Sequence, residues 1–123
     1  MRAVDFKRLE FVRTEAWRKL SRILEHYDAL LCPTMSQTAR PVEEDDAPYY
    51  ADHADGLYHG LDMTSPFNFV SQCPALSLPS GWSADGLPIG LQIVARRYRD
   101  DLALQIGAAL ERVRPWAQRR PPI

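Results

Sequence analysis

Side chains that could bind a metal ion gather in one polar stretch of this 123-residue chain. His53 and His59 stand there among Asp52, Asp55 and Asp62. Imidazole and carboxylate groups are common ligands of divalent transition metals. The spacing of the two histidines matches no recognised ligand pattern, and the stretch has no helical or strand period. We therefore expect solvated loop side chains here and no metal site.

A serine hydrolase arrangement is the second chemistry to weigh. Ser71 or Ser80 could be combined with His26 or His59 and an aspartate. Any chain with several serines and histidines permits such a combination, and no Gly-x-Ser-x-Gly turn accompanies either serine. Nucleophilic catalysis needs the nucleophile and its base within hydrogen-bond reach. The sequence therefore assigns no catalytic residue.

Cofactor and redox chemistry have little support. Cys32 and Cys73 lie among apolar neighbours, which predicts two reduced, buried thiols. Two cysteines make neither a disulfide framework nor a zinc site. The glycines never form G-x-G-x-x-G, so a phosphate-binding loop is not expected. We expect no cofactor.

Composition and charge limit the class of protein. The mass of 14.0 kDa corresponds to one domain, and the 46% apolar and 25% charged shares are ordinary for a globular one. The net charge of −1 favours neither nucleic acid nor a membrane surface as partner. No apolar run reaches the ~20 residues of a spanning helix or resembles a signal peptide. The expected location is therefore cytoplasmic.

Two amphipathic helices are predicted from apolar spacing. The first covers residues 4–27, with an apolar face formed by Phe6, Leu9, Val12, Ala16, Leu20, Ile23 and Tyr27. The second covers residues 100–114, with Asp100 as its expected cap and Pro115 just after its end. The basic and proline-rich tail, residues 115–123, is expected to be frayed.

Three short strands are predicted between these helices, at residues 29–32, 75–78 and 89–94. Asp85-Gly86 is a tight-turn signal, so the last two strands should form an antiparallel hairpin with a loop around Trp82. Ser65 and Pro66 are typical of a helix start, with Ser65 as cap. Residues 36–60 lack any period and carry four consecutive acids, which predicts a long acidic loop.

Several of these stretches, in this order, resemble the C-terminal part of the amidase-signature family of amide hydrolases. That group includes the glutamine-hydrolysing component of the glutamyl-tRNA(Gln) and aspartyl-tRNA(Asn) amidotransferases. The matching stretches are YDALLCPT at 27–34, PFN at 66–68, PALSLPSG at 74–81, GLPIGLQ at 86–92 and AALE at 108–111. The resemblance departs from the common pattern at 69–73, where FVSQC replaces Leu-Thr-Gly-x and indicates a subgroup.

The resemblance implies an α/β fold. Residues 1–123 would form a single partial domain, the C-terminal portion of the amidase-signature α/β/α fold, with two helices on a small mixed sheet. It also implies that Thr64, Phe67 and Asn68 lie near the substrate pocket. These enzymes use two serines and a lysine, and the serine pair lies in a Gly-Ser-Ser-Gly-Gly stretch well upstream of this region. The chain has no Ser-Ser pair, and its only lysines are Lys7 and Lys19 on the first helix.

Two functions follow as hypotheses. In the first, the chain is the C-terminal portion of a C–N hydrolase, supplying scaffold and part of the substrate pocket and inactive alone. Its partner would be a small amide substrate, bound only with the missing N-terminal part, and self-association would accompany the open sheet edges. In the second, it is a non-enzymatic interaction module derived from an amidase. The residues do not separate the two.

Overall fold

The computed structural model describes residues 2–70 and 72–120. Helix α1 (Ala3–His26) leads into strand β1 (Ala29–Pro33), and a long connection holding the short helix α2 (Ala47–Tyr50) follows. Helix α3 (Ser65–Val70), strands β2 (Ala75–Trp82) and β3 (Pro88–Ala95), and helix α4 (Asp100–Val113) complete the chain. No helix within these residues has both the length and the apolar character required to span a membrane.

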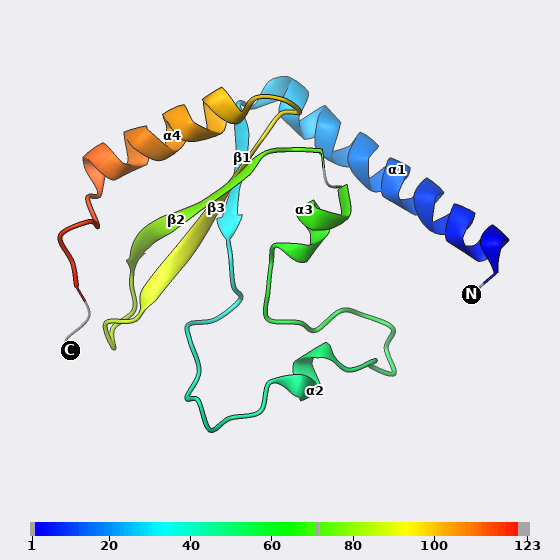
Figure 1. The fold of residues 1–123 in the computed structure, drawn as a ribbon, viewed down its shortest axis with the longest axis horizontal. Coiled ribbons are helices and arrows are strands. Elements are labelled where there is room, and N and C mark those ends of the chain that lie inside the picture. The colour runs from blue at the N-terminus through cyan, green and yellow to red at the C-terminus, as the bar shows by residue number, and fades with distance from the viewer. Residues whose placement is uncertain (1, 71, 121–123) are drawn as a thin grey trace.

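The three strands form one sheet in the order β1-β3-β2 (Figure 1). Leu31 of β1 and Leu76 of β2 both pair with Ile93 of β3. The small α/β fold and the β2–β3 hairpin are thus confirmed. The expectation of a mixed sheet is wrong for the described residues, because both pairings are antiparallel. β1 and β2 run in the same direction but lie on opposite sides of β3, so they never pair with each other.

The hairpin turn lies where Asp85-Gly86 predicts it. Gly86 adopts a φ of +81°, a left-handed conformation that costs glycine little. The Ser83 backbone N–H donates to the Leu87 carbonyl at 2.9 Å and closes the turn. Trp82 pairs with Pro88 inside the hairpin, so it belongs to strand β2 and not to a loop as the sequence suggested.

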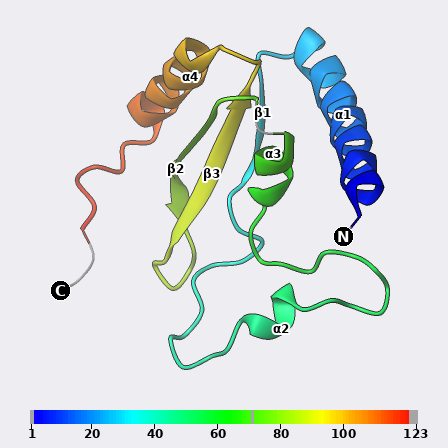
Figure 2. The ribbon, with the colours of Figure 1, turned by 45° about the vertical axis from the view of Figure 1, so that its right-hand side comes forward.

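Helices cover both faces of the sheet (Figure 2). α4 lies on one face, where a Cβ at Gly107 would collide with the side chain of Leu76. On the other face Leu20 and Leu24 of α1 pack with Val70 of α3, and Leu30 of β1 contacts this cluster. The order of layers is therefore α4, sheet, then α1 with α3, which agrees with the expected α/β/α arrangement.

Only the second half of α1 is packed. Leu24 is 1% exposed, whereas Phe6, Leu9 and Val12 are 51%, 50% and 57% exposed. The first half extends beyond the sheet, at the right-hand side of Figure 1. The periodic face predicted over residues 4–27 is real, but within the described residues only part of it is covered.

The start of α4 differs from the prediction. Arg99 occupies the cap position, and Asp100 is the first helical residue, so Asp100 does not cap the helix. The carboxylates of Asp100 and Asp101 lie in the first turn, where the helix dipole favours negative charge. Arg99 pairs with Asp101, with 2.8 Å between Nε and Oδ1.

The segment after α4 returns along β2. Arg114 donates from Nη1 to the Ser80 carbonyl at 3.2 Å. The guanidinium of Arg119 lies 4.2 Å from the centre of the Trp82 ring. Residues 121–123 of the tail fall outside the described residues, and its frayed state stays a prediction.

The long connection between β1 and α3 is fixed to the sheet at both of its ends. Met35 and Asp62 form an isolated antiparallel bridge. The Ser36 backbone N–H donates to the Leu61 carbonyl at 2.8 Å, and the Met63 N–H donates to the Thr34 carbonyl at 2.9 Å. The two ends of the connection therefore lie side by side, and the acidic stretch between them forms a loop (Figure 1).

Candidate functional site

Thr64, Phe67 and Asn68 converge on one pocket. They line a cavity of about 190 Å³ together with Ala75 and Ser77 of β2 and Gln92 of β3. The pocket lies between α3 and the sheet face that α4 leaves free. The structure thus brings together all three residues singled out through the family resemblance; their contact with a substrate stays a proposal.

The start of α3 explains how these side chains are held. The Asp62 carboxylate accepts hydrogen bonds from the Ser65 backbone N–H (3.2 Å), the Ser65 hydroxyl and the Tyr58 hydroxyl. The Thr64 carbonyl accepts from the N–H groups of Phe67 and Asn68 at 3.0 and 3.1 Å.

Two consequences follow for this helix start. Ser65 is already helical, so it donates to Asp62 and does not act as the cap that the sequence suggested. The hydrogen bonds from Ser65, and next that from Tyr58, lower the pKa of Asp62 below its usual value. The same Asp62 hydrogen bond raises the pKa of Tyr58.

Gln92 is the functional residue that the sequence reasoning missed. It is 1% exposed in the middle of β3, and its Nε2 donates to the Pro33 carbonyl (3.2 Å) and to the Met63 carbonyl (2.8 Å). One buried amide therefore joins the end of β1 to the backbone just before Thr64. A signal was present, since Gln92 is the single polar residue in the run from Ile89 to Ala95.

Chemically, this first pocket can bind polar groups but offers no base. Hydroxyl and amide side chains of Thr64, Asn68, Ser77 and Gln92 supply donors and acceptors, and the Phe67 ring supplies an apolar wall. Its lining contains no histidine, lysine or carboxylate among the residues that the structure describes. Since a serine or threonine hydroxyl needs an adjacent base to act as nucleophile, the pocket fits binding and not bond cleavage.

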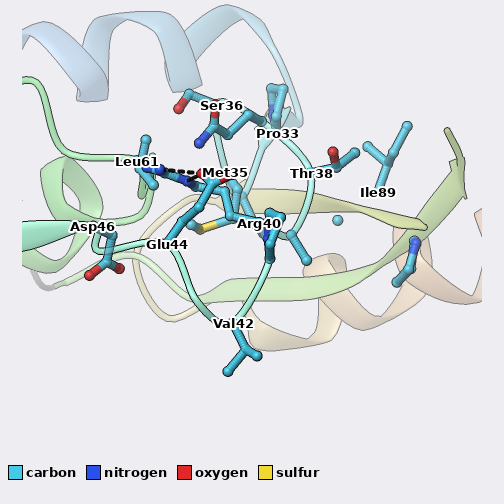
Figure 3. Close-up of a pocket in the computed structure, with 16 residues that line it drawn as sticks. Pro33, Met35, Ser36, Thr38, Arg40, Val42, Glu44, Asp46, Leu61 and Ile89 are labelled. Carbon is cyan, nitrogen blue, oxygen red and sulfur yellow. Dashed lines mark hydrogen bonds and ion pairs between the residues drawn. The ribbon is translucent and has the colours of Figure 1, made fainter. Parts of the chain in front are cut away.

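A second, larger pocket of about 730 Å³ lies beyond Gln92. The connection after β1 wraps around it and the start of β3 closes it (Figure 3). Its lining is largely apolar, with Arg40, Glu44 and Asp46 as the charged members. Pro33, whose carbonyl Gln92 holds, belongs to this lining, so Gln92 stands between the two pockets.

The two histidines considered as metal ligands contact each other, without forming a metal-binding set in the described residues. His59 Nε2 lies 2.7 Å from Asp55 Oδ2, and the rings of His53 and His59 stack with centroids 4.1 Å apart. No set of three or more His, Cys, Asp or Glu residues in 2–70 and 72–120 could hold a metal ion. Ser71, one of the two serines considered for a triad, lies outside the described residues.

The two cysteines are free thiols, each partly buried. Burial raises the pKa of Cys32, and a Gln92 hydrogen bond partly offsets this. Burial also raises the pKa of Cys73, where the positive charge of Arg97 acts in the opposite direction. Raised pKa values disfavour the reactive thiolate, so both side chains behave as small apolar groups.

Comparison with known proteins decides the family. A family model described as Amidase matches residues 2–104. The chain belongs to the amidase family. Among curated amidase relatives, the acylamidase of Rhodococcus erythropolis is 38% identical over 120 residues, which are 96% of this chain and 25% of the relative. A glutamyl-tRNA(Gln) amidotransferase polypeptide of a Picosynechococcus species is 36% identical over 113 residues, 91% of this chain and 22% of the relative.

Solved amidase structures agree in fold. A 6-aminohexanoate cyclic dimer hydrolase complexed with substrate superposes with a TM-score of 0.70 at 34% identity, covering 93% of this chain and 24% of that one. A bacterial aryl acylamidase of the amidase-signature family gives a TM-score of 0.70 at 30% identity, covering 88% and 22%. The chain thus spans about a quarter of the length of the amidases it matches.

Proposed function

We propose that this amidase chain forms the C-terminal portion of an amide C–N hydrolase, where it supplies scaffold and one wall of the substrate pocket. Thr64, Phe67 and Asn68 are the residues proposed to contact the substrate. The observation that carries the proposal is their convergence, with Ser77 and Gln92, on one pocket at the sheet face opposite α4.

The chemistry of the pocket suggests that this chain binds substrate and that the rest of an amidase domain supplies the catalytic groups. Amide hydrolysis needs a nucleophile, a base and donors for the developing oxyanion. The first pocket offers hydroxyl and amide groups and an aromatic wall, which orient a substrate without attacking it. Catalysis would then require groups from the rest of an amidase domain, and the 123 residues alone are proposed to be inactive.

A chimera tests the pocket assignment. Residues 1–123 replace the matching quarter of the R. erythropolis acylamidase, and amide hydrolysis is measured with Phe67→Leu and Phe69→Leu as a matched pair. Both rings lie on α3, but only Phe67 lines the pocket. We expect Phe67→Leu to change KM or the preference among amide chain lengths, while Phe69→Leu leaves both within twofold.

Three results would contradict the proposal. Equal effects of the two phenylalanine changes would remove Phe67 from the substrate contacts. Wild-type kinetics after Asn68→Ala would show that Asn68 does not contact the substrate. An inactive chimera that is folded, with the thermal unfolding of the parent acylamidase, would favour the interaction-module hypothesis.

A further inference from the structure

Tyr58 ties the last part of the long connection to the start of α3. Its hydroxyl donates to Asp62 Oδ1, while the Ser65 backbone N–H and hydroxyl both donate to Asp62 Oδ2. The two oxygens of one carboxylate therefore have separate partners, one in the stretch between α2 and α3 and one in α3 itself (Figure 1). We call Tyr58, Asp62 and Ser65 the latch.

The Tyr58 side chain folds back over its own chain to reach the carboxylate. A Cβ at Gly60 would collide with the Tyr58 ring, so the ring can lie there only because residue 60 is glycine. The Tyr50 ring of α2 lies beside it, with ring centroids 6.5 Å apart. Tyr58 is nevertheless 59% exposed, so these contacts and not burial determine where its hydroxyl lies.

Tyr58 determines which way the Asp62 carboxylate faces. A carboxylate can turn about its Cβ–Cγ bond, because torsions of this kind have broad energy minima. A donor on Oδ1 restricts that rotation and keeps Oδ2 directed at Ser65. The Asp62 backbone is held separately, through its bridge to Met35, so Tyr58 acts on the Asp62 side chain and not on the course of the main chain.

The latch holds the end of α3 that forms the first pocket. α3 has six residues, too few for a helix to be stable in isolation. Its far end is anchored by Val70, which packs with α1, and its near end by the bonds of Ser65 to Asp62. Phe67 and Asn68 donate to the Thr64 carbonyl within that first turn. The pocket walls therefore move with the end that Asp62 fixes.

We propose that Tyr58 is a positioning residue for the first pocket: through Asp62 and Ser65 it fixes the first turn of α3, and with it the pocket walls formed by Phe67 and Asn68. The acidic connection is thereby coupled to substrate binding, since a movement that withdraws Tyr58 frees the Asp62 carboxylate. The role toward substrate rests on the proposed function, because it concerns the same pocket. The effect on α3 does not depend on it.

Hydrogen exchange of the 123-residue protein tests the effect on α3. The exchange rates of the Phe67 and Asn68 amides are measured by NMR. We expect Tyr58→Phe to speed both by roughly three- to tenfold and to leave the amides of β3 unchanged, because losing the hydrogen bond to Asp62 makes only the first turn of α3 less stable. Tyr50→Phe is the matched control: it removes the hydroxyl of the neighbouring ring, which gives Asp62 no hydrogen bond among the described residues, and should change neither rate by more than about twofold.

Kinetics of the R. erythropolis acylamidase chimera test the effect on substrate. We expect Tyr58→Phe to raise KM roughly threefold or more with kcat nearly unchanged, since a residue that shapes a binding wall affects ground state and transition state alike. Asp62→Ala should raise KM as well, and Tyr58→Phe should add nothing in that background, because Tyr58 acts through Asp62. A merely structural role would lower the amount of folded enzyme and leave KM as it is.

A second variant disturbs the latch without touching its hydrogen-bonding groups. The Cβ of Gly60→Ala would displace the Tyr58 ring, so the changes in exchange and in KM should match those of Tyr58→Phe. Gly60→Ala also takes the place of Tyr58→Phe if that variant fails to fold by circular dichroism.

The outcomes separate this inference from the proposed function. Unchanged exchange of Phe67 and Asn68 in the latch variants, a fall in kcat alone, or additive KM effects of Tyr58→Phe and Asp62→Ala would overturn the inference. An active chimera whose KM does not respond to Tyr58→Phe also overturns it, and leaves the proposed function standing. Faster exchange in the latch variants together with a folded but inactive chimera supports the positioning of α3 by Tyr58 and removes the proposed function.

Discussion

The side-chain amide of Gln92 donates a hydrogen bond to the Met63 carbonyl at 2.8 Å, directly before the residue that opens the candidate substrate pocket. The same nitrogen donates to the Pro33 carbonyl, which borders the larger pocket. Gln92 is fully buried, so its amide joins the backbone beside one pocket to the backbone beside the other.

Replacing the side-chain amide of Gln92 should destabilise the fold. Gln92→Leu leaves the carbonyls of Pro33 and Met63 without this part-buried donor, and we expect a loss of about 1–3 kcal/mol in the free energy of unfolding. Gln105→Leu on the exposed face of α4 is the control and should change it by less than about 0.5 kcal/mol. Urea unfolding followed by circular dichroism measures both. Similar midpoints for the two variants would show that Gln92 does not hold the pockets together.

Close packing at Gly90 gives a second prediction. A Cβ at this position would collide with the Thr34 hydroxyl, so Gly90→Ala should destabilise the fold by roughly 1–3 kcal/mol. Removing the obstacle with Thr34→Ala should recover part of that loss, because the two changes are coupled. A double-mutant cycle by thermal unfolding measures this. Additive effects of the two changes would mean that the contact is not the cause.

Acid should weaken the fold through Asp62. Its hydrogen bonds from Ser65 and Tyr58 lower its pKa below the usual 3.8. A lowered folded-state pKa gives stability that is fully present above pH ~4 and is lost as the pH falls through the folded value. Asp62→Asn should therefore flatten the pH dependence of the unfolding temperature below pH ~4. A curve for Asp62→Asn identical to that of the wild type would refute the role.

Self-association follows from the uncovered surface. β1 and β2 each have one edge without a partner in the described sheet, and Phe6, Leu9 and Val12 are half exposed on α1. Open edges and apolar faces promote pairing between chains. We expect the purified 123-residue protein to form oligomers, and Leu9→Glu with Val12→Glu to reduce their size in light scattering. A monodisperse wild-type monomer would contradict this expectation.

The sequence predicted the elements better than the contacts between them. The turn at Asp85-Gly86 and the bounds of α1 and β1 follow from local rules, and the structure confirms them within a few residues. The antiparallel place of β1 beside β3 depends on a pairing across some sixty residues, which no local pattern reveals. The same limit hid Gln92, whose two acceptors lie far away along the chain.

The candidate site likewise contains residues that the sequence predicted and residues that only the structure revealed. Thr64, Phe67 and Asn68 were reached through motif resemblance, and the fold brings them to one pocket. The sequence did not reveal the surroundings of Arg40 in the larger pocket, because Tyr49 and Glu44 contact its side chain only once the acidic connection has folded back. In the sequence it is one arginine among thirteen, beside a run of acids that indicated only a loop.

The central claim is that this chain works as part of an amide hydrolase. The most direct measurement supplies the 123-residue protein together with the remaining three quarters of the R. erythropolis acylamidase and follows ammonia release from an aliphatic amide. We expect no turnover from either piece alone and turnover from the mixture, lowered by Asn68→Ala. Turnover by this chain alone, or none from a mixture that co-elutes as a complex, would contradict the account.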